Sequence, residues 1–335
     1  MTETMTEPSP ADGTAVVDVL ITLINYKTAE MTIDCARSVL EHAGDVDYRL
    51  VIIDNASNDG SVEALEAWID SLPDGHRIEL VCSTVNTGFA GGHNLGIATD
   101  WTARHYMPLN SDAVIRPGMI ERLLAALEAD PGLGLVGPAL LNNDGAVEVS
   151  AFRFHSPWSE FERAACTGPI TRWLDRRRVA LPLPPPAGEI DWVSFACVLI
   201  RGEVVRDLEA LNAGYFLYFD DSDFCVRARR RGWRAGYVPE AVAVHFRGGS
   251  APVKTLDRAK RRLPKYWYAS RARMFYTYGG RGHLVAANLA WHLGRAVAQL
   301  RWLTGRRPNP MPARQWLDIW TNVLDPTGDN HAPGR

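Results

Sequence analysis

A chain of 335 residues has room for one large α/β domain or for two smaller ones. Hydrophobic residues make up 46% and charged residues 22%, as in an ordinary globular protein. No run approaches the about 18 uncharged apolar residues of a membrane-spanning helix, so we expect none. The net charge is −3. No nucleic-acid-binding motif is present, so we expect no nucleic-acid partner.

The charge is distributed unevenly along the chain. Residues 251–335 contain 15 Lys and Arg against 4 Asp and Glu, which leaves 21 basic and 35 acidic residues in the first 250. A basic C-terminal region predicts an anionic partner, either a membrane surface or a phosphate group.

The cysteines and the N-terminus indicate a cytoplasmic protein. The five cysteines are scattered and lack Cys-x-x-Cys spacing, so we expect reduced thiols rather than disulfides or a zinc site. The first 13 residues are polar and lack the basic and apolar regions of a signal peptide. We expect residues 1–14 to form a disordered tail.

Apolar, β-branched runs alternate with helical patterns through the first 130 residues. Expected strands lie at 16–24, 49–53, 78–82 and 105–109, and expected helices lie at 28–40, 62–69 and 117–129. This alternation indicates βαβ units and a mostly parallel sheet flanked by helices, which is the α/β class.

The pattern becomes less regular after a further expected strand at 133–141, which ends in a hairpin turn at 142–145. Residues 152–179 are aromatic and basic and are expected to be helical in part. The proline-rich segment 180–188 predicts a stiff loop. Two more strands are expected, at 190–200 and near 235–238.

Polar residues follow the expected strands at one edge of this sheet. Asp54 directly follows one expected strand, and Asp112 closes the Asn-Ser-Asp segment 110–112 that ends another. A glycine-rich loop at 86–96 opens another helix. Ligands of open α/β sheets bind beyond the carboxyl ends of the strands, and glycine-rich loops let backbone amides approach a phosphate. Each feature alone can be a turn or a cap, but together they favour a ligand site. The dinucleotide fingerprint Gly-x-Gly-x-x-Gly is absent.

Three carboxylates, Asp220, Asp221 and Asp223, crowd into four positions ahead of a basic helical pattern. Like charges this close repel one another unless a cation, an arginine or solvent offsets them. In one interpretation they mark the start of a helix, and Asp223 pairs with Arg227 four residues later. In the other they belong to an active site, with Asp221 turned roughly 100° around the helix from Asp220.

Residues 284–303 form a helical pattern that is apolar almost all round. Its polar residues lie on one stripe: Asn288, His292, Arg295 and Gln299. Such a helix either packs inside the protein or lies in a membrane interface. The basic and aromatic residues that precede it favour the interface.

Several stretches together resemble the family 2 glycosyltransferases, especially their bacterial rhamnosyltransferase-like branch. The matching stretches are 24–26, 54–57, 86–96, 110–112, 191–194, 220–223 with Arg227, 232–233, and His245. No single stretch is specific, but they occur in the family's order over about residues 16–250. The resemblance implies a GT-A fold and the transfer of a sugar from a nucleotide diphosphate donor, with inversion at the anomeric carbon.

The resemblance also implies roles for individual residues. Asp54 would contact the base or the ribose, and Asp112, together with His245, would hold Mg²⁺ or Mn²⁺ next to the donor. Asp221 takes the place of the general base, with Asp220 as the alternative, and a carboxylate at a helix N-terminus is expected to stay ionised at neutral pH. Asp220 and Asp223 would orient the acceptor or pair with Arg227. The other residues expected around the nucleotide-sugar are Asn25, Tyr26, Asn55, Asn86, Gly88, Gly91, Asn94, Asn110 and Trp192.

The chain departs from the family pattern near the expected acceptor site, where Phe195 replaces a usual glycine and Asn212-Ala213 replaces an acidic pair. By resemblance, the donor would be dTDP-rhamnose or a UDP-sugar. The acceptor would be a glycan or a glycan on a polyprenyl diphosphate, in cell-surface polysaccharide synthesis. The alternatives are a catalytically idle nucleotide-sugar-binding scaffold and another Mg²⁺-dependent nucleotide enzyme.

The expected organisation is a glycosyltransferase domain at 15–250, with a nucleotide-sugar half to about residue 140 and an acceptor half after it. A helical basic region at 251–325 and a tail at 326–335 follow. We expect the protein in the cytoplasm, with peripheral contact to the inner face of the cell membrane. The oligomeric state is not indicated.

Overall fold

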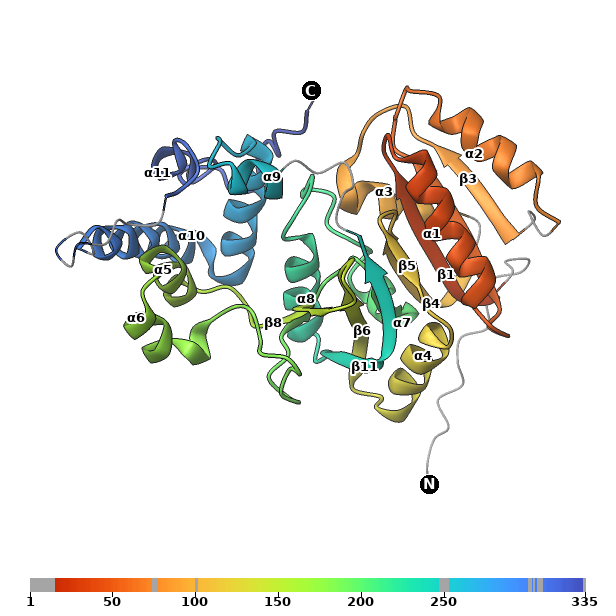
Figure 1. Ribbon diagram of the computed structural model, residues 1–335, viewed down its shortest axis with the longest axis horizontal. Helices are drawn as coiled ribbons and strands as arrows, with labels where there is room; N and C mark the ends of the chain where they lie inside the picture. Colours follow the sequence, from red (N-terminus) through yellow and green to blue (C-terminus); the bar gives the residue numbers. More distant parts are fainter. Residues whose placement is uncertain are drawn as a thin grey trace.

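The computed structural model describes residues 16–73, 77–99, 102–246, 253–300, 303, 305 and 310–333. A sheet with helices on both faces occupies one side of the molecule, and helices from the middle and the end of the chain lie beside it (Figure 1). The tail expected at 1–14 lies outside the described residues.

The first part of the chain builds four parallel strands in the order β3-β2-β1-β4. The strands are β1 (Val16–Asn25), β2 (Tyr48–Asp54), β3 (Ile78–Cys82) and β4 (Thr102–Asn110), and the helices are α1 (Ala29–His42), α2 (Ser61–Asp70) and α3 (Gly88–Ile97). Asn25 is the register partner of Asp54, and the neighbouring Ile24 is the partner of Asn110. The polar residues that end these strands therefore meet at one edge of the sheet.

Later strands complete the same sheet. These elements are β5 (Ala113–Ile115), α4 (Met119–Ala129), β6 (Leu133–Leu141), β7 (Val147–Glu148), β10 (Leu199–Arg201), α7 (Gly202–Asp207), α8 (Asp220–Arg230) and β11 (Arg234–His245). The order continues β4-β10-β6-β11-β5, with β10 antiparallel to both its neighbours and β11 parallel to β6. The predicted hairpin at 142–145 is confirmed between β6 and β7.

Two expected strands have different extents in the structure. The apolar run 190–200 is divided between β9 (Trp192–Val193), which pairs with β8 (Ala151–Phe152) in a small second sheet, and β10. An apolar run does not show by itself which sheet each part joins. The strand expected near 235–238 is the start of β11, which continues past a register shift between Val238 and Val242 to end at His245.

Two hydrophobic cores sandwich the sheet, and this explains why β2 is a continuous apolar run. Leu50 and Ile52 face a core shared with α1, α2 and α4, whereas Val51 and Ile53 face a core shared with α3, α7 and α8. A parallel strand that is buried on both faces has no polar side to alternate with. The site described below lies where these strands end.

A group of helices beside the sheet contains both the segment after β8 and the C-terminal region. They are α5 (Pro157–Ala165), α6 (Gly168–Trp173), the 3₁₀ helix Asp175–Arg177, α9 (Val253–Arg258), α10 (Lys265–Gln299) and α11 (Gln315–Asp318). The helix expected at 284–303 is the second half of α10, which bends at Gly279 and Gly280 and packs on α5. The expected C-terminal tail is partly fixed, because Arg273 Nη2 donates to Thr327 O at 2.6 Å.

Candidate active site

A buried hydrogen-bond network joins the carboxyl ends of β1 and β2. Asn25 Nδ2 donates to Asp54 Oδ1 at 2.7 Å and to Ser57 Oγ at 3.0 Å, and the Ser57 amide donates to Asp54 Oδ2 at 3.0 Å. The Asn25 oxygen accepts a bond from Thr32 Oγ1 at 3.0 Å, and Asn25 is fully buried. The Asn25 side chain therefore positions Asp54, and its contact with a nucleotide stays a prediction.

Asn55 fastens the glycine-rich segment to the end of β2. Its Nδ2 donates to Gly88 O at 3.0 Å and to Asn86 Oδ1 at 3.2 Å, and its Oδ1 accepts from the Thr87 amide at 2.9 Å. The expected loop ahead of a helix is wrong in one respect: α3 already begins at Gly88, so most of these glycines are helical. A Cβ at Gly92 would lie 2.7 Å from Ile24 Cδ1, so its absence lets α3 lie close to β1.

The start of α3 is also connected to the segment that precedes α8. Gly88 has φ +74°, and a Cβ there would lie 2.0 Å from Phe216 O, which accepts the Phe89 amide at 2.8 Å. One turn further, Asn94 Nδ2 donates to Leu211 O at 2.8 Å, and its Oδ1 accepts from the Leu211 amide at 3.0 Å. Gly88 and Asn94 thus hold α3 against the segment that leads into the acidic helix α8.

Asp112 and His245 meet although 133 positions separate them. Asp112 directly precedes β5, which pairs antiparallel with the end of β11, and His245 is the register partner of Ala113. His245 Nε2 lies 3.1 Å from Asp112 Oδ1, and both side chains are nearly buried. The Phe246 amide donates to Asp112 O at 2.8 Å and fixes the backbone of the pair.

This pair suits a hard divalent cation that takes most of its ligands from elsewhere. A carboxylate oxygen and an imidazole nitrogen lie side by side here. The carboxylate suits Mg²⁺ or Mn²⁺, and imidazole is a common ligand of transition metals. Within the described ranges no group of three or more His, Cys, Asp and Glu could hold a metal. Donor phosphate oxygens and water would have to complete the shell, as is usual for Mg²⁺ at phosphate sites.

The acidic cluster begins α8 and follows two residues in the left-handed region. Tyr218 has φ +71° and Phe219 has φ +66°, which non-glycine residues rarely adopt and which often marks a functional site. Burial, the phenol of Tyr266 and the carboxylates of Asp112 and Asp220 all raise the pKa of Tyr218. Tyr218 therefore lies within electrostatic range of both the candidate metal site and the acidic cluster.

Asp220 and Asp221 differ in exposure although they are adjacent. Asp220 is buried, and burial together with the charge of Asp221 raises its pKa well above the usual range. Asp221 is half-buried, and burial raises its pKa to about 7, although its carboxylate accepts hydrogen bonds from the amides of Ser222 and Phe195. Asp221 is therefore only partly ionised at neutral pH, where it was expected to stay ionised, because burial outweighs the helix N-terminus.

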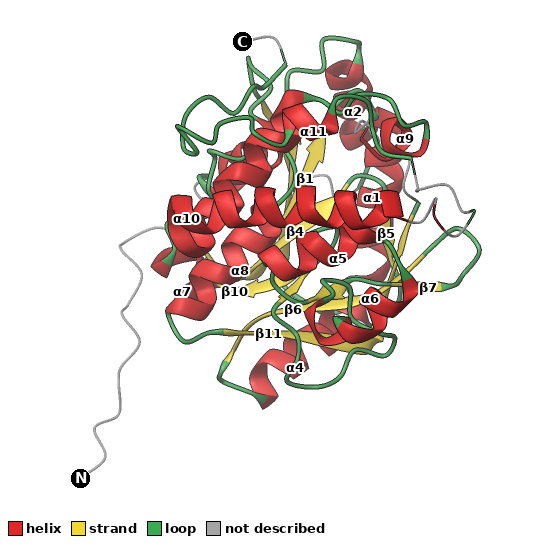
Figure 2. Ribbon diagram, turned by 90° about the vertical axis from the view of Figure 1, so that its left-hand side faces the viewer, coloured by secondary structure: helices red, strands yellow, loops and turns green. Residues whose placement is uncertain are grey.

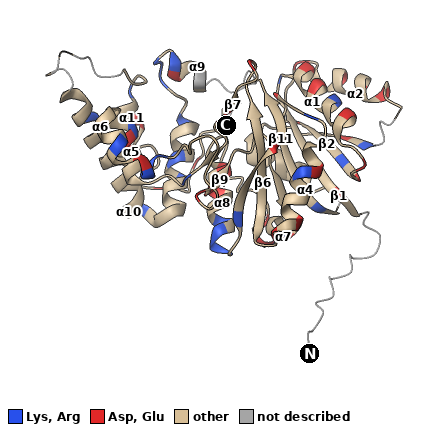
Figure 3. Ribbon diagram, turned by 60° about the horizontal axis from the view of Figure 1, so that its bottom comes forward, with Lys and Arg blue, Asp and Glu red and all other residues tan. Residues whose placement is uncertain are grey.

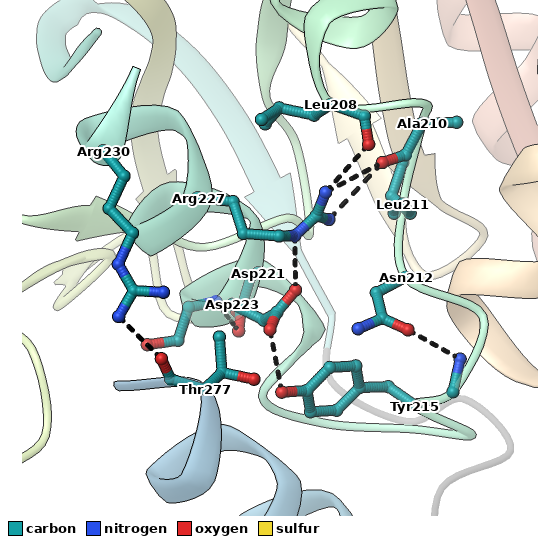
Figure 4. Close-up of polar contacts among 12 residues, drawn as sticks. Leu208, Ala210, Leu211, Asn212, Tyr215, Asp221, Asp223, Arg227, Arg230 and Thr277 are labelled. Carbon is teal, nitrogen blue, oxygen red and sulfur yellow. Dashed lines mark hydrogen bonds and ion pairs between the residues drawn. The ribbon is translucent and has the colours of Figure 1, made fainter. Parts of the chain in front are cut away.

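Asp223 is held in a polar network inside the protein (Figure 4). It is fully buried and accepts bonds from Tyr215 Oη at 2.9 Å and from Arg227 Nε at 2.8 Å. Arg227 Nη1 also donates to Leu208 O at 3.0 Å. The predicted pairing of Asp223 with Arg227 is confirmed, and it ties α8 to the loop after α7.

The other predicted residues occupy varied positions. Tyr26 is half-buried beside Lys27, and the Asn110 amide donates to Ala196 O at 2.9 Å. Gly91 lies in the first turns of α3. Trp192 stacks on Phe152 in the small second sheet, with a centroid distance of 4.1 Å, and its Nε1 donates to Arg153 O at 2.9 Å. Trp192 therefore packs within the β8–β9 sheet, and its contact with the nucleotide-sugar stays a prediction.

Two tyrosines that sequence reasoning missed lie beside the acidic cluster. Tyr215 holds Asp223, and Tyr278 of α10 forms a short hydrogen bond with Ser222 Oγ on α8. Tyr215 belongs to the aromatic run before the cluster, so proximity in sequence could have drawn attention to it. No sequence signal links Tyr278 to a helix that lies more than 45 residues earlier.

The known proteins that this chain resembles are glycosyltransferases. Residues 18–171 match the model described as "Glycosyl transferase family 2". N-acetylglucosaminyl-diphospho-decaprenol L-rhamnosyltransferase of Mycobacterium tuberculosis is 27% identical over 214 residues, which cover 60% of this chain and 67% of that protein. The hexosyltransferase Agl10 of low-salt glycan biosynthesis in Haloferax volcanii is 26% identical, with 68% and 67% covered.

A shorter match and a solved structure extend these comparisons. Rhamnosyltransferase WbbL of Escherichia coli is 33% identical over 57 residues, which are 17% of this chain and 22% of that protein. The structure of mannosyltransferase PcManGT from Pyrobaculum calidifontis, in complex with GDP-Man and Mn²⁺, aligns with a TM-score of 0.52 and 16% identity. The alignment covers 93% of this chain and 86% of that one.

Proposed function

Because the chain is a family 2 glycosyltransferase with a GT-A fold, we propose that it transfers a sugar from a nucleotide diphosphate donor to a lipid-linked glycan, with inversion at the anomeric carbon. L-Rhamnose from a dTDP donor is the first candidate, and a UDP-sugar is the second. The names of the relatives from Mycobacterium tuberculosis and Escherichia coli support rhamnose, and the first of these names supports a polyprenyl-diphosphate acceptor.

The observation that carries this proposal is the contact between Asp112 and His245 at 3.1 Å, at the sheet edge where the Asp54 network also lies. A divalent cation at this pair would offset the charge that develops on the diphosphate leaving group. Asp54, whose carboxylate already accepts a hydrogen bond from Asn25, would accept another from the base or the ribose of the donor. The start of α3, fastened by Asn55, would line the diphosphate.

Asp221 is the proposed general base. The acceptor oxygen forms a bond to the anomeric carbon while the bond from that carbon to the diphosphate breaks, and the acceptor proton moves to the Asp221 carboxylate. Its half-exposure leaves Asp221 accessible to an acceptor, whereas the buried Asp220 is not. With a pKa of about 7, Asp221 is basic enough to accept the proton and is still substantially ionised at neutral pH.

The site of action that fits this acceptor is the cytoplasmic surface of the cell membrane. A polyprenyl diphosphate stays in the bilayer because of its long hydrocarbon chain, so the enzyme must reach it there. The net positive charge of residues 251–335 supports such a location.

Ligand-induced thermal shifts test the donor site. The wild type, Asp112→Ala and the control Asp144→Ala, an exposed aspartate in the β6–β7 turn, are heated with dTDP, UDP, GDP and their sugars, each with and without Mn²⁺. A ligand that binds only the folded state stabilises it by about 2.7 kcal/mol at 100 times its Kd. We expect one nucleotide to stabilise the wild type and the control only with metal, and Asp112→Ala not at all. Metal-independent or absent binding would refute the proposed donor site.

A further inference from the structure

The second half of α10 buries polar as well as apolar residues against the protein. Asn288 is fully buried and accepts a bond from Arg271 Nη1 at 2.7 Å, and His292 Nε2 accepts from Trp320 Nε1 at 3.0 Å. Arg271 is buried as well, in an ion pair with Glu160 of α5 at 2.9 Å. Two members of the polar stripe therefore face the protein, which leaves an apolar side of the helix for the outside.

Apolar side chains cover that outer side. Val285, Leu289, Leu293 and Leu300 are 36%, 56%, 60% and 57% exposed. At 100° per residue these four positions fall within an arc of about 80°, so they form one continuous strip, which we call the outer face of α10. Exposed apolar strips on a monomer mark surfaces that bind a partner or a membrane.

Exposed tryptophans lie on the helices next to α10. α5 packs along α10 and carries Trp158, which is 50% exposed, and α6 carries Trp173, which is 70% exposed. The two indole rings are in edge-to-face contact with their centroids 6.2 Å apart. α10, α5 and α6 all lie on the side of the molecule that faces the viewer in Figure 2. Tryptophan favours the boundary between lipid headgroups and hydrocarbon, because its ring is both apolar and polar.

The charge next to these tryptophans is positive. Arg172, Arg176 and Arg177 are exposed on α6 and the 3₁₀ helix after it, and no carboxylate of the described residues pairs with them. The neighbouring Asp175 is paired with Arg178. Basic segments mark these helices in Figure 3, whereas acidic residues mark the start of α8. An anionic headgroup layer would complement these arginines, but a second copy of the chain would bring the same arginines toward one another across a twofold axis.

We propose that the outer face of α10, together with Trp158 and Trp173, docks on an anionic lipid bilayer. None of the described helices is long and apolar enough to cross a membrane, so the contact lies in the interfacial layer. This inference deepens the proposed function and rests on it for its purpose, which is access to a lipid-linked acceptor.

The position of α10 relative to the acidic cluster fits this purpose. Tyr278, directly before the glycine bend, contacts Ser222 next to Asp221, whereas Leu289 lies roughly 14 Å of helix beyond Gly280, at 1.5 Å per residue. One helix thus reaches from the proposed catalytic site to the proposed bilayer contact, so a docked enzyme would hold Asp221 close to the membrane surface.

Vesicle flotation tests the docking. The full chain is mixed at physiological salt with phosphatidylcholine vesicles, with and without phosphatidylglycerol. The variants are Leu289→Glu/Leu293→Glu and Arg172→Gln/Arg176→Gln/Arg177→Gln. Val85→Glu is the matched control, because Val85 is 57% exposed but lies between β3 and α3. The thermal midpoint of each variant shows that it is folded.

We expect the wild type and the control to float with anionic vesicles. The leucine variant should bind at least about tenfold more weakly to every vesicle. The arginine variant should lose about 100-fold on anionic vesicles only, at about fivefold per arginine. A wild type that ignores anionic vesicles, or a leucine variant that binds like the control, would overturn the proposal. So would a wild-type dimer, measured by light scattering, that Leu289→Glu/Leu293→Glu converts to monomers.

Turnover separates this inference from the proposed function. With the preferred donor, the leucine variant should glycosylate a short-chain, water-soluble acceptor at the wild-type rate and should lose activity on the same acceptor embedded in vesicles. Wild type that binds vesicles but transfers no sugar to either acceptor would refute the proposed function while leaving the docking intact. Wild type that transfers to both acceptors without binding vesicles would refute the docking alone.

Discussion

The ion pair between Asp223 and Arg227 offers a quantitative test of how α8 is held. Arg227→Met removes the guanidinium and keeps much of the aliphatic stem, which leaves the fully buried Asp223 carboxylate with Tyr215 as its remaining partner. Breaking a buried pair by removing one partner costs about 3–5 kcal/mol, because the other charge stays buried and uncompensated. Unfolding entropy of about 0.7 kcal/mol/K for 335 residues converts this cost to a fall of about 4–7 °C in the Tm.

A double-mutant cycle isolates the pair from its surroundings. Asp223→Asn removes the charge and keeps the shape, so Arg227→Met should cost at least about 1–2 kcal/mol less in an Asp223→Asn background. Arg37→Met is the control, because Arg37 forms an exposed pair with Asp34 and should cost about 1 kcal/mol or less. Differential scanning calorimetry and urea unfolding give the energies. If Arg227→Met costs no more than Arg37→Met, or if the cycle is additive, the buried pair does not hold α8.

Four further predictions concern the acidic cluster and the start of α3. Asp221→Asn should lower kcat by about 10²–10⁴-fold without changing the affinity for the donor, and a smaller effect than that of Asp220→Asn would assign the base to Asp220 instead. The kcat of the wild type should rise with pH through about 7 as Asp221 loses its proton, and a flat profile between pH 5 and about 8 would contradict the role of this carboxyl. The free energy of unfolding should fall as the pH rises above about 4 toward the raised pKa of Asp220, because the folded state keeps the proton on this carboxyl and the unfolded state releases it. In a pH series of urea melts, Asp220→Asn should flatten this decline. Gly88→Ala should lower the Tm and weaken donor binding, because a Cβ would lie 2.0 Å from Phe216 O and the backbone has φ +74°. An unchanged Tm and unchanged donor binding would show that the start of α3 and the segment at Phe216 separate freely.

The sequence predicted the parts of the fold that depend on local pattern. The βαβ units of the first 110 residues follow from alternating apolar runs and helical patterns, and the ends of β1, β2 and β4 bring Asn25, Asp54 and Asn110 to one edge because parallel strands share a direction. The pairing of Asp223 with Arg227 was also predictable, since the two residues are one helical turn apart.

Other features depended on contacts between distant segments. Residues 190–200 divide between two sheets because β10 pairs with a strand far earlier in the chain. Asp112 contacts His245 over 133 positions because β11 pairs with β5. The resemblance implied that Asp112 and His245 act together, but no local pattern places them 3.1 Å apart. Glycines expected in a loop became part of α3 because close packing against β1 needs them there.

The sequence by itself determined that the chain forms an α/β sheet with polar strand ends, an acidic helix start and a basic C-terminal region, because these are properties of spacing and composition. Only the tertiary structure decided which side of each feature faces outward. It buried Asp220 and Asp223 and left Asp221 half-exposed, and it turned Asn288 inward while Leu289 and Leu293 stayed outside. Exposure depends on which neighbours cover a residue. Asn288 is buried against Arg271, which lies earlier in α10 across the glycine bend, and Arg271 pairs with Glu160 of α5, which no local pattern connects to α10.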